Sequence, residues 1–261
     1  MKTIRSRMQW NIAALFALAI AASAPAGAEQ SPKEFIAAGD RDYDARHPQA
    51  ARENFAHAVQ AEPSNYEALW KASRVEVDLA ESLPKGAVQD SLMTSAREHA
   101  EAAVASNPRD AEGHFSLARA VGRKALTVGG MDRIRFAKMV RAEALEALKY
   151  DSLNAGALHV LGAWNAEIMR VNGLARAIAK AFLGASVFGL ASWGEAQRLL
   201  EQSVQLEPSR IVHHLDLGII YADRGNKQKA REQFELIAAA PVREYNDPLY
   251  KQQAAERLRK L

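Results

Sequence analysis

The sequence contains no cysteine among its 261 residues. Disulfide bonds and thiolate nucleophiles are therefore excluded, as is lipid attachment through a cysteine near the N-terminus. Three catalytic patterns are also missing: the Gly-x-Ser-x-Gly elbow of hydrolases, a glycine-rich phosphate loop after a strand, and a pair of carboxylates within an apolar run. These absences predict a protein that is not an enzyme and that uses no cofactor.

The numbers of basic and acidic residues do not indicate a nucleic-acid partner. The chain has 34 Lys and Arg against 31 Asp and Glu, but Lys2, Arg5 and Arg7 lie within the first 28 residues. The rest of the chain has 31 basic and 31 acidic side chains, so its alkaline isoelectric point implies no basic patch. Because phosphate neutralisation dominates nucleic-acid affinity, we expect no nucleic-acid partner.

Residues 1–28 have the pattern of a signal peptide. A basic start precedes an apolar run from about Trp10 to Ala22, and Ala26-Gly27-Ala28 supplies the small-x-small motif of a cleavage site. We expect cleavage after Ala28 and a periplasmic or secreted protein. The alternative is an uncleaved membrane anchor, although the apolar run is shorter than the roughly 20 residues that a spanning helix needs.

Helical periodicity runs through the chain after residue 30 and predicts an all-α fold. Four similar breaks interrupt this periodicity, at 61–70, 106–115, 150–159 and 206–215. Before each break, three small or apolar residues at spacing i, i+4, i+7 share one helix face. These sets are Ala51-Phe55-Ala58, Ala96-Ala100-Ala103, Val140-Ala144-Ala147 and Ala196-Leu200-Ser203. After each break a very small residue recurs, as at Gly162 and Gly218, which allows two helices to approach closely.

These recurring features, with the proline that ends most units, resemble the tetratricopeptide repeat. The resemblance implies stacked helix-turn-helix units, each of which buries its apolar face against its neighbours. We expect a tetratricopeptide-like superhelix of about five helix pairs over residues 29–247. The second helices of these pairs are anchored at Ala51, Ala96, Val140, Ala196 and Ala230. A final helix over 248–261, with Lys and Arg near its C-terminal end, is expected to cap the array.

The units are longer than the 34 residues of a plain repeat. Successive breaks lie 45, 44 and 56 residues apart, and the largest surplus is an insertion at 172–191 within the fourth unit. Asn172-Gly173 is interpreted as the end of one helix, and Ser192 with Glu195 as a capping box that starts the next.

The insertion is itself apolar and amphipathic. Leu174, Ile178 and Phe182 follow spacing i, i+4, i+8, and Phe188 lies in the loop after them. These four side chains are candidates for contact with a membrane or a partner. Two charges and a break at Gly184 argue against a membrane-spanning helix. An interfacial helix with a basic polar face is one alternative, and packing onto the array is the interpretation we favour.

A narrower resemblance rests on three stretches: "ALHVLGAWNAEI" at 157–168, "AKAFLG" at 179–184, and the run that begins "SWGEAQRLLEQ" and ends at residue 242. They are similar to the regulator-of-microtubule-dynamics family and its bacterial relatives, which have a tetratricopeptide-like fold with the same apolar insertion. The resemblance covers most of residues 60–261. It does not imply a microtubule partner here, because the expected export removes the chain from the cytoplasm.

Seven histidines raise the question of a metal site. His213 and His214 are adjacent, so on a helix their side chains diverge by about 100° and do not readily share one ion. The other five fall in different units, and none forms a His-x-x-x-His pair. We expect no metal site and interpret the histidines as solvated or at the edge of the core.

With no enzyme motif found, we expect the function to be binding of another molecule. The tetratricopeptide resemblance implies that the first helices of successive units line a concave groove. One-turn spacing places Trp70 with Arg74, and Phe115 with Arg119, on two of these helices. Such pairs suit an extended peptide that carries an acidic group or a free carboxylate. The alternative is that the aromatic rings pack between repeats and the arginines are merely solvated.

We accordingly predict an exported, non-catalytic scaffold that binds a protein or peptide through the groove. The alternative function is a peripheral membrane-surface adaptor that uses the apolar insertion at 174–190.

Overall fold

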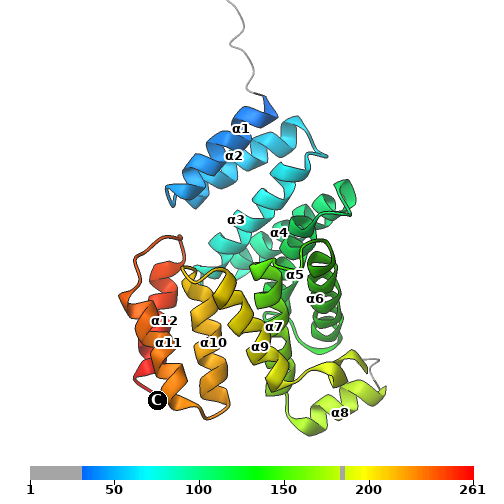
Figure 1. Cartoon of the computed structure of the whole chain (residues 1–261). Coiled ribbons are helices and arrows are strands. Elements are labelled where there is room, and N and C mark those ends of the chain that lie inside the picture. The colour runs from blue at the N-terminus through cyan, green and yellow to red at the C-terminus, as the bar shows by residue number, and fades with distance from the viewer. Residues whose placement is uncertain (1–30, 183–185) are drawn as a thin grey trace, which may run out of the picture. The chain divides into compact units, whose positions relative to one another are not determined.

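Helices make up all the regular secondary structure in a computed structural model of the chain, which describes residues 31–182 and 186–261 (Figure 1). The expected signal peptide lies outside the described residues, as do the side chains of Ile178 and Phe182. Five helix pairs follow one another: α1 (Pro32–Asp44) with α2 (Pro48–Ala61), α3 (Tyr66–Glu81) with α4 (Ala87–Ser106), α5 (Ala111–Ala125) with α6 (Gly130–Tyr150), α7 (Ala155–Arg170) with α9 (Trp193–Leu206), and α10 (Ile211–Asp223) with α11 (Lys227–Ala239).

A final helix, α12 (Asp247–Leu258), follows the fifth pair. Two further elements, α8 (Gly173–Phe182) and the short 3-10 helix η1 (Ser186–Leu190), lie between α7 and α9. The predicted all-α array of five pairs with a helix at its end is confirmed.

Very small residues set the distance between the two helices of a pair. At Gly39 and Gly218, a Cβ atom would stand 2.5 and 2.6 Å from the rings of Phe55 and Phe234. Gly162 holds the equivalent place in α7, where a Cβ would stand 2.9 Å from a leucine of α9. Because packed interiors do not tolerate such overlaps, these positions exclude any side chain.

Two buried histidines form hydrogen bonds that connect the turns between helix pairs to the helices that follow. The Nε2 atom of His114, in the first turn of α5, lies 3.1 Å from the carbonyl oxygen of Pro108, and its Nδ1 atom lies 2.7 Å from Glu143 of α6. His214 of α10 makes equivalent contacts. Its Nε2 atom lies 2.9 Å from the carbonyl oxygen of Pro208, and its Nδ1 atom lies 2.7 Å from Gln233 of α11. These side chains are structural links between a turn and the second helix that follows it.

The surplus residues of the second and third units lie mostly in long second helices. The helices α4 and α6 have 20 and 21 residues, whereas α2 and α9 have 14 each. These units are thus extended by about two helical turns rather than by long loops.

The insertion in the fourth unit differs locally from expectation. Asn172 begins α8 instead of ending α7, because its side-chain oxygen accepts a hydrogen bond from the Ala175 amide at 2.8 Å. The Arg176 guanidinium lies 3.3 Å from the carbonyl oxygen of Ile168 and so covers the C-terminal end of α7. The apolar loop expected after α8 contains η1, which buries Phe188. No helix in the described part of the chain is long and apolar enough to cross a bilayer.

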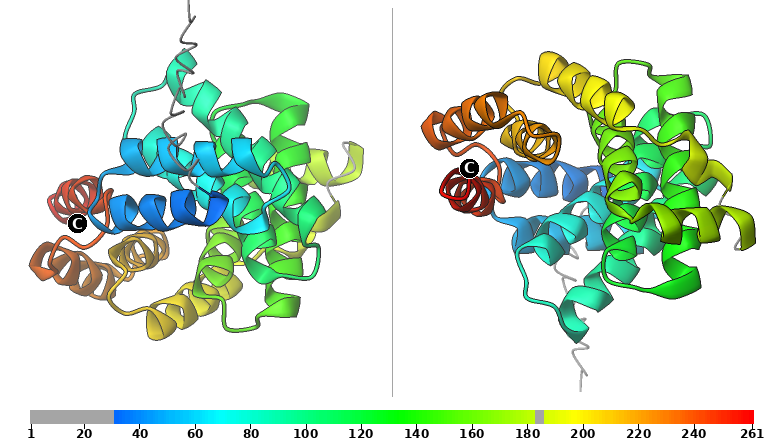
Figure 2. Two further views of the ribbon diagram at one scale, coloured as in Figure 1. Left: turned by 90° about the horizontal axis from the view of Figure 1, so that it is seen from above. Right: turned by 90° about the horizontal axis from the view of Figure 1, so that it is seen from below.

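The C-terminal segment returns to the start of the array. Figure 2 shows α12, in red, beside α11, in orange, and hydrogen bonds connect this segment to α3. The Asn246 side-chain amide donates to the backbone carbonyl of Asp78 at 2.9 Å, and the Tyr250 hydroxyl donates to Glu81 at 2.5 Å. Arg46, in the turn between α1 and α2, donates to a backbone carbonyl at residue 242. The last helix therefore does more than end the array, since it also bonds to the end of α3.

Candidate functional site

A cavity of about 760 Å³ lies among α5, α7, α10 and α12, with α6 and α8 at one end. The first helices of three successive pairs therefore line it, as the repeat resemblance implies for the groove. Half-buried apolar side chains supply part of its wall: Val160 and Ala163 from α7, and Val212 and Ile219 from α10. The volume falls within the range of sites that bind small molecules or peptide side chains.

A buried ion-pair cluster lies at one end of this cavity, where α3, α5 and α12 meet. Arg119 Nη2 lies 2.5 Å from Asp78 and 3.4 Å from Glu81, and Arg123 Nε lies 2.7 Å from Glu81. Burial opposes the charge on Arg119, but the two carboxylates raise its pKa well above the usual value. The positive charge on Arg119 is therefore neutralised within the protein.

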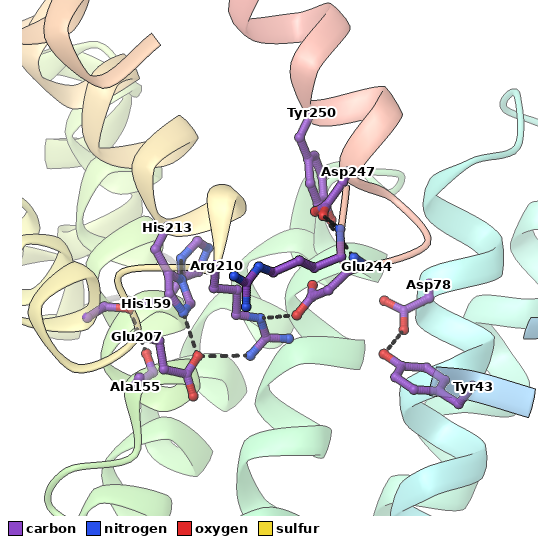
Figure 3. A network of polar contacts seen from close by, with 12 residues as sticks. Tyr43, Asp78, Ala155, His159, Glu207, Arg210, His213, Glu244, Asp247 and Tyr250 are labelled. Atoms are coloured by element: carbon purple, nitrogen blue, oxygen red, sulfur yellow. Dashed lines mark hydrogen bonds and ion pairs between the residues drawn. The ribbon is translucent and has the colours of Figure 1, made fainter. Parts of the chain in front are cut away.

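Tyrosines complete the hydrogen bonds of this cluster. The Tyr43 hydroxyl donates to Asp78 at 2.6 Å (Figure 3), and the Tyr250 hydroxyl donates to Glu81. Burial raises the pKa of Tyr43, and the negative charge of Asp78 adds to that effect. Both hydroxyls consequently remain protonated donors, and they satisfy carboxylate oxygens that the arginines do not reach.

The four residues predicted to bind a peptide, Trp70, Arg74, Phe115 and Arg119, all line one small cavity of about 10 Å³ between α3 and α5. This volume is enough for one water molecule. The Arg74 guanidinium stacks on the ring of Tyr43, 3.9 Å from its centroid, and lies 5.1 Å from the Trp70 ring. The structure thus brings the predicted residues together and engages Arg74 with aromatic rings of the same chain.

Phe115 packs between repeats, because a Cβ atom at Gly156 of α7 would overlap its ring. This packing agrees with the alternative that we considered for the aromatic residues, whereas Arg119 is ion-paired rather than solvated. Contact of the four residues with a peptide stays a prediction.

A polar chain of four side chains connects α7, the end of α9 and α10, and Figure 3 labels three of them, His159, His213 and Glu207. His213 Nε2 lies 3.0 Å from Glu207, the Nδ1 atoms of His213 and His159 lie 2.7 Å apart, and His159 Nε2 lies 3.0 Å from Asp216. A hydrogen bond between two Nδ1 atoms needs one donor and one acceptor.

Burial lowers the pKa of His213 to about 3, although the hydrogen bond with Glu207 opposes that effect. The same hydrogen bond lowers the pKa of Glu207 to about 2. His213 is therefore neutral, and it donates from Nε2 to Glu207 and accepts at Nδ1 from His159.

The sequence motifs do not indicate this pair, because 54 residues separate its members. A signal was nevertheless present. His159 and His213 occupy the first helices of adjacent pairs, at the fifth and third helical positions, where neighbouring first helices face one another. Within the residues that the structure describes, no group of three or more histidines and carboxylates has the arrangement of a metal site.

The four candidates in the insertion have separate environments. Leu174 is 74% exposed, whereas Phe188 is buried and meets the Trp164 ring edge-on at a centroid distance of 6.3 Å. The side chains of Ile178 and Phe182 are outside the described part, so a shared apolar face stays a prediction. Leu190, which the sequence analysis did not select, is 62% exposed.

Five stacked helix pairs, with a cavity lined by the first helices of three of them, define a tetratricopeptide-like helical repeat protein. Among solved structures, the chain is similar to TTC0263, a tetratricopeptide-repeat protein of Thermus thermophilus, with a TM-score of 0.62 and 18% identity over 87% of this chain and 100% of that one. It is also similar to PilF of Pseudomonas aeruginosa, with a TM-score of 0.51 and 15% identity over 88% and 86% of the two chains. At these identities the likeness shows the fold.

The family model for regulator of microtubule dynamics proteins 1–3 matches residues 35–261, and the chain belongs to this family. The resemblance inferred from the motifs at 157–168 and beyond is thereby confirmed. No individual curated protein gives a significant match to the sequence.

Replacement of Arg119 by Met should destabilise the fold by roughly 3–5 kcal/mol, because it leaves the buried carboxylate of Asp78 without its cation. Urea denaturation would measure this loss. Arg257→Met is the matched control, since Arg257 also lines the cavity but is exposed, and its effect should stay within about 0.5 kcal/mol. Equal effects of the two substitutions would contradict the assignment of Arg119 to a buried cluster.

Stability should fall in acid because His213 is buried in its neutral form. Its pKa is about 3 in the folded protein, so between pH 6.5 and 3 the unfolded chain binds a proton that the folded one does not. From pH 7 to pH 5 this group alone should remove about 2 kcal/mol from the free energy of unfolding. His213→Gln should flatten the profile measured by urea denaturation, whereas the exposed control His47→Gln should not. A profile that is unchanged in His213→Gln would contradict this origin.

Proposed function

We propose that this chain is a non-catalytic scaffold that binds a peptide segment of another protein in the cavity among α5, α7, α10 and α12. The observation that carries the proposal is a concave cavity of about 760 Å³ whose wall includes half-buried Val160, Ala163, Val212 and Ile219. Binding is favourable when a partner removes apolar surface from water. Stacked helical repeats generally use their concave faces as interaction surfaces, which adds support from the fold.

We also propose that the scaffold acts outside the cytoplasm. The support is the basic, apolar and small-x-small pattern at 1–28, which lies outside the described residues. The partner is accordingly sought in a periplasmic extract, and the mass of the intact chain recovered from that fraction shows whether residues 1–28 have been removed. A chain that keeps these residues and stays in the cytoplasmic fraction would contradict export.

Cross-linking and pull-down from that extract test binding at the cavity. Ile219→Lys combined with Val160→Lys places two charges on the apolar wall at half-buried positions, and we expect loss of the protein partners that the wild type retains. Leu236→Lys is the control, since Leu236 is 54% exposed on α11 and does not line the cavity. The same partners on all three proteins would rule out this cavity as the binding site.

A second candidate function is a membrane-surface adaptor, and a specific observation favours it. Leu174 and Leu190, at the two ends of the insertion, expose 74% and 62% of their surface. This function predicts that the protein sediments with vesicles of phosphatidylcholine and phosphatidylglycerol, because exposed apolar side chains insert at the interface. It also predicts that Leu174→Asp abolishes sedimentation while Leu236→Asp does not. A wild-type chain that remains in the supernatant would rule out the membrane-surface function.

A further inference from the structure

Gly122 in α5 differs from the glycines that set the spacing between paired helices. A Cβ atom at Gly39, Gly162 or Gly218 would approach a neighbouring side chain to 2.9 Å or less. At Gly122 the nearest atom to such a Cβ would be a methyl carbon of Val140, at 3.6 Å. This is an ordinary van der Waals distance, so the packing of α5 on α6 does not require a glycine there.

The backbone does not require a glycine at this position either. Gly122 lies within α5, and the glycines of the described residues that have a positive φ are Gly130 and Gly225. Glycine is among the least favourable residues inside a helix, so its presence lowers the stability of α5. What the glycine provides is space, because Gly122 lines the cavity of about 760 Å³.

A second small residue faces the same cavity from the next first helix. Phe115 of α5 packs on Gly156 of α7, and seven residues further along both helices lie Gly122 and Ala163. Both line the cavity, and Ala163 is half-buried. The cavity wall therefore has a hollow at Gly122 of α5 and Ala163 of α7, because neither residue has a side chain larger than a methyl group.

The arginines that lie on either side of this hollow along α5 and α7 are paired with carboxylates of the chain. Arg119, one turn before Gly122, is held by Asp78 and Glu81. Arg170, two turns after Ala163, pairs with Asp223 at 2.6 Å and with Glu167. A charged group in the hollow would lose its water without gaining an unpaired counter-charge there, which is costly. An uncharged apolar group is complementary to this surface.

Ion-paired side chains flank the hollow along the two helices. Arg119 lies three residues before Gly122 on α5, and Glu167 lies four residues after Ala163 on α7. An alkyl chain that ran along either helix would cross an ion pair, whereas a single side chain fits between them.

From these observations we infer that Gly122 and Ala163 form a seat for one bulky apolar side chain, such as Leu, Phe or Trp, of the bound peptide. This inference rests on the proposed function and adds the residues that determine specificity. The missing side chain of Gly122 lets the peptide approach the backbone of α5, and the methyl group of Ala163 forms the facing wall.

Selection of a phage-displayed random dodecamer library on the wild-type chain supplies the probes, and fluorescence anisotropy of labelled peptides measures their affinity. We expect the selected peptides to share a bulky apolar residue. Gly122→Leu and Ala163→Phe should each weaken their binding by about tenfold or more, because they fill the seat. Ala37→Leu adds the same side chain at an exposed site on α1 and should leave affinity unchanged.

Gly122→Ala separates a role in binding from a role in the fold. We expect its Tm to equal or exceed that of the wild type, because alanine favours the helix and has room beside Val140. Its peptide affinity should nevertheless fall. A lower Tm with unchanged affinity would show that Gly122 serves the fold and would overturn the inference.

The remaining outcomes distinguish the seat from the function on which it rests. Peptides that bind the wild type and all variants equally would overturn the seat while leaving peptide binding intact, as would selected peptides without an apolar residue in common. Failure to select any peptide would contradict the proposed function itself. Decanoate is tested in parallel, and its binding in the absence of peptide binding would assign the hollow to an alkyl chain and overturn the inference.

Discussion

The buried ion pairs that Asp78 and Glu81 make with Arg119 and Arg123 are the interaction on which the rest of this structure depends. They join α3 to α5, and Tyr250 brings α12 to the same carboxylates. In a repeat array, each unit contacts mainly its neighbours. Here a polar cluster connects the second and third pairs to the last helix, which is more than 160 residues away from α3 along the chain. Loss of one partner would leave charge in a buried site, so the cluster fixes this end of the cavity.

This constraint also shapes what the cavity recognises. Arg119, Arg123 and Arg170 face it, but their charges are already paired with carboxylates of the same chain. Recognition therefore rests on apolar contact and on shape, and the hollow at Gly122 and Ala163 supplies the shape. Most glycines of the first helices are required by packing, whereas Gly122 is required neither by packing nor by the backbone. That contrast is what separates a residue that serves the fold from one that serves binding.

Much of the fold follows from local sequence. Ser192 accepts a hydrogen bond from the Glu195 amide and begins α9 as predicted. The predicted capping box is only half formed, because the Ser192 amide donates to Asn165 instead of to Glu195. Periodicity alone does not show which charges meet. The partners of Arg119 lie 41 and 38 residues away, and Asn246 bonds to a carbonyl 168 residues away. One-turn spacing relates Arg119 to Phe115 on the same helix. It does not identify the carboxylate partners of Arg119, which belong to α3.

The central claim is that a partner's peptide enters the cavity beside α5 and α7, and site-specific photo-cross-linking tests it most directly. A benzophenone side chain replaces Arg257 of α12 in one protein, an exposed residue that lines the cavity outside the seat. In another protein it replaces the exposed Leu236 of α11, and both proteins are irradiated in the native extract. Mass spectrometry then identifies the cross-linked peptides. If a peptide enters the cavity, position 257 cross-links to a defined segment of another protein beside a bulky apolar residue, and position 236 does not. Cross-links of the same segment from position 236, with none from position 257, would contradict this claim.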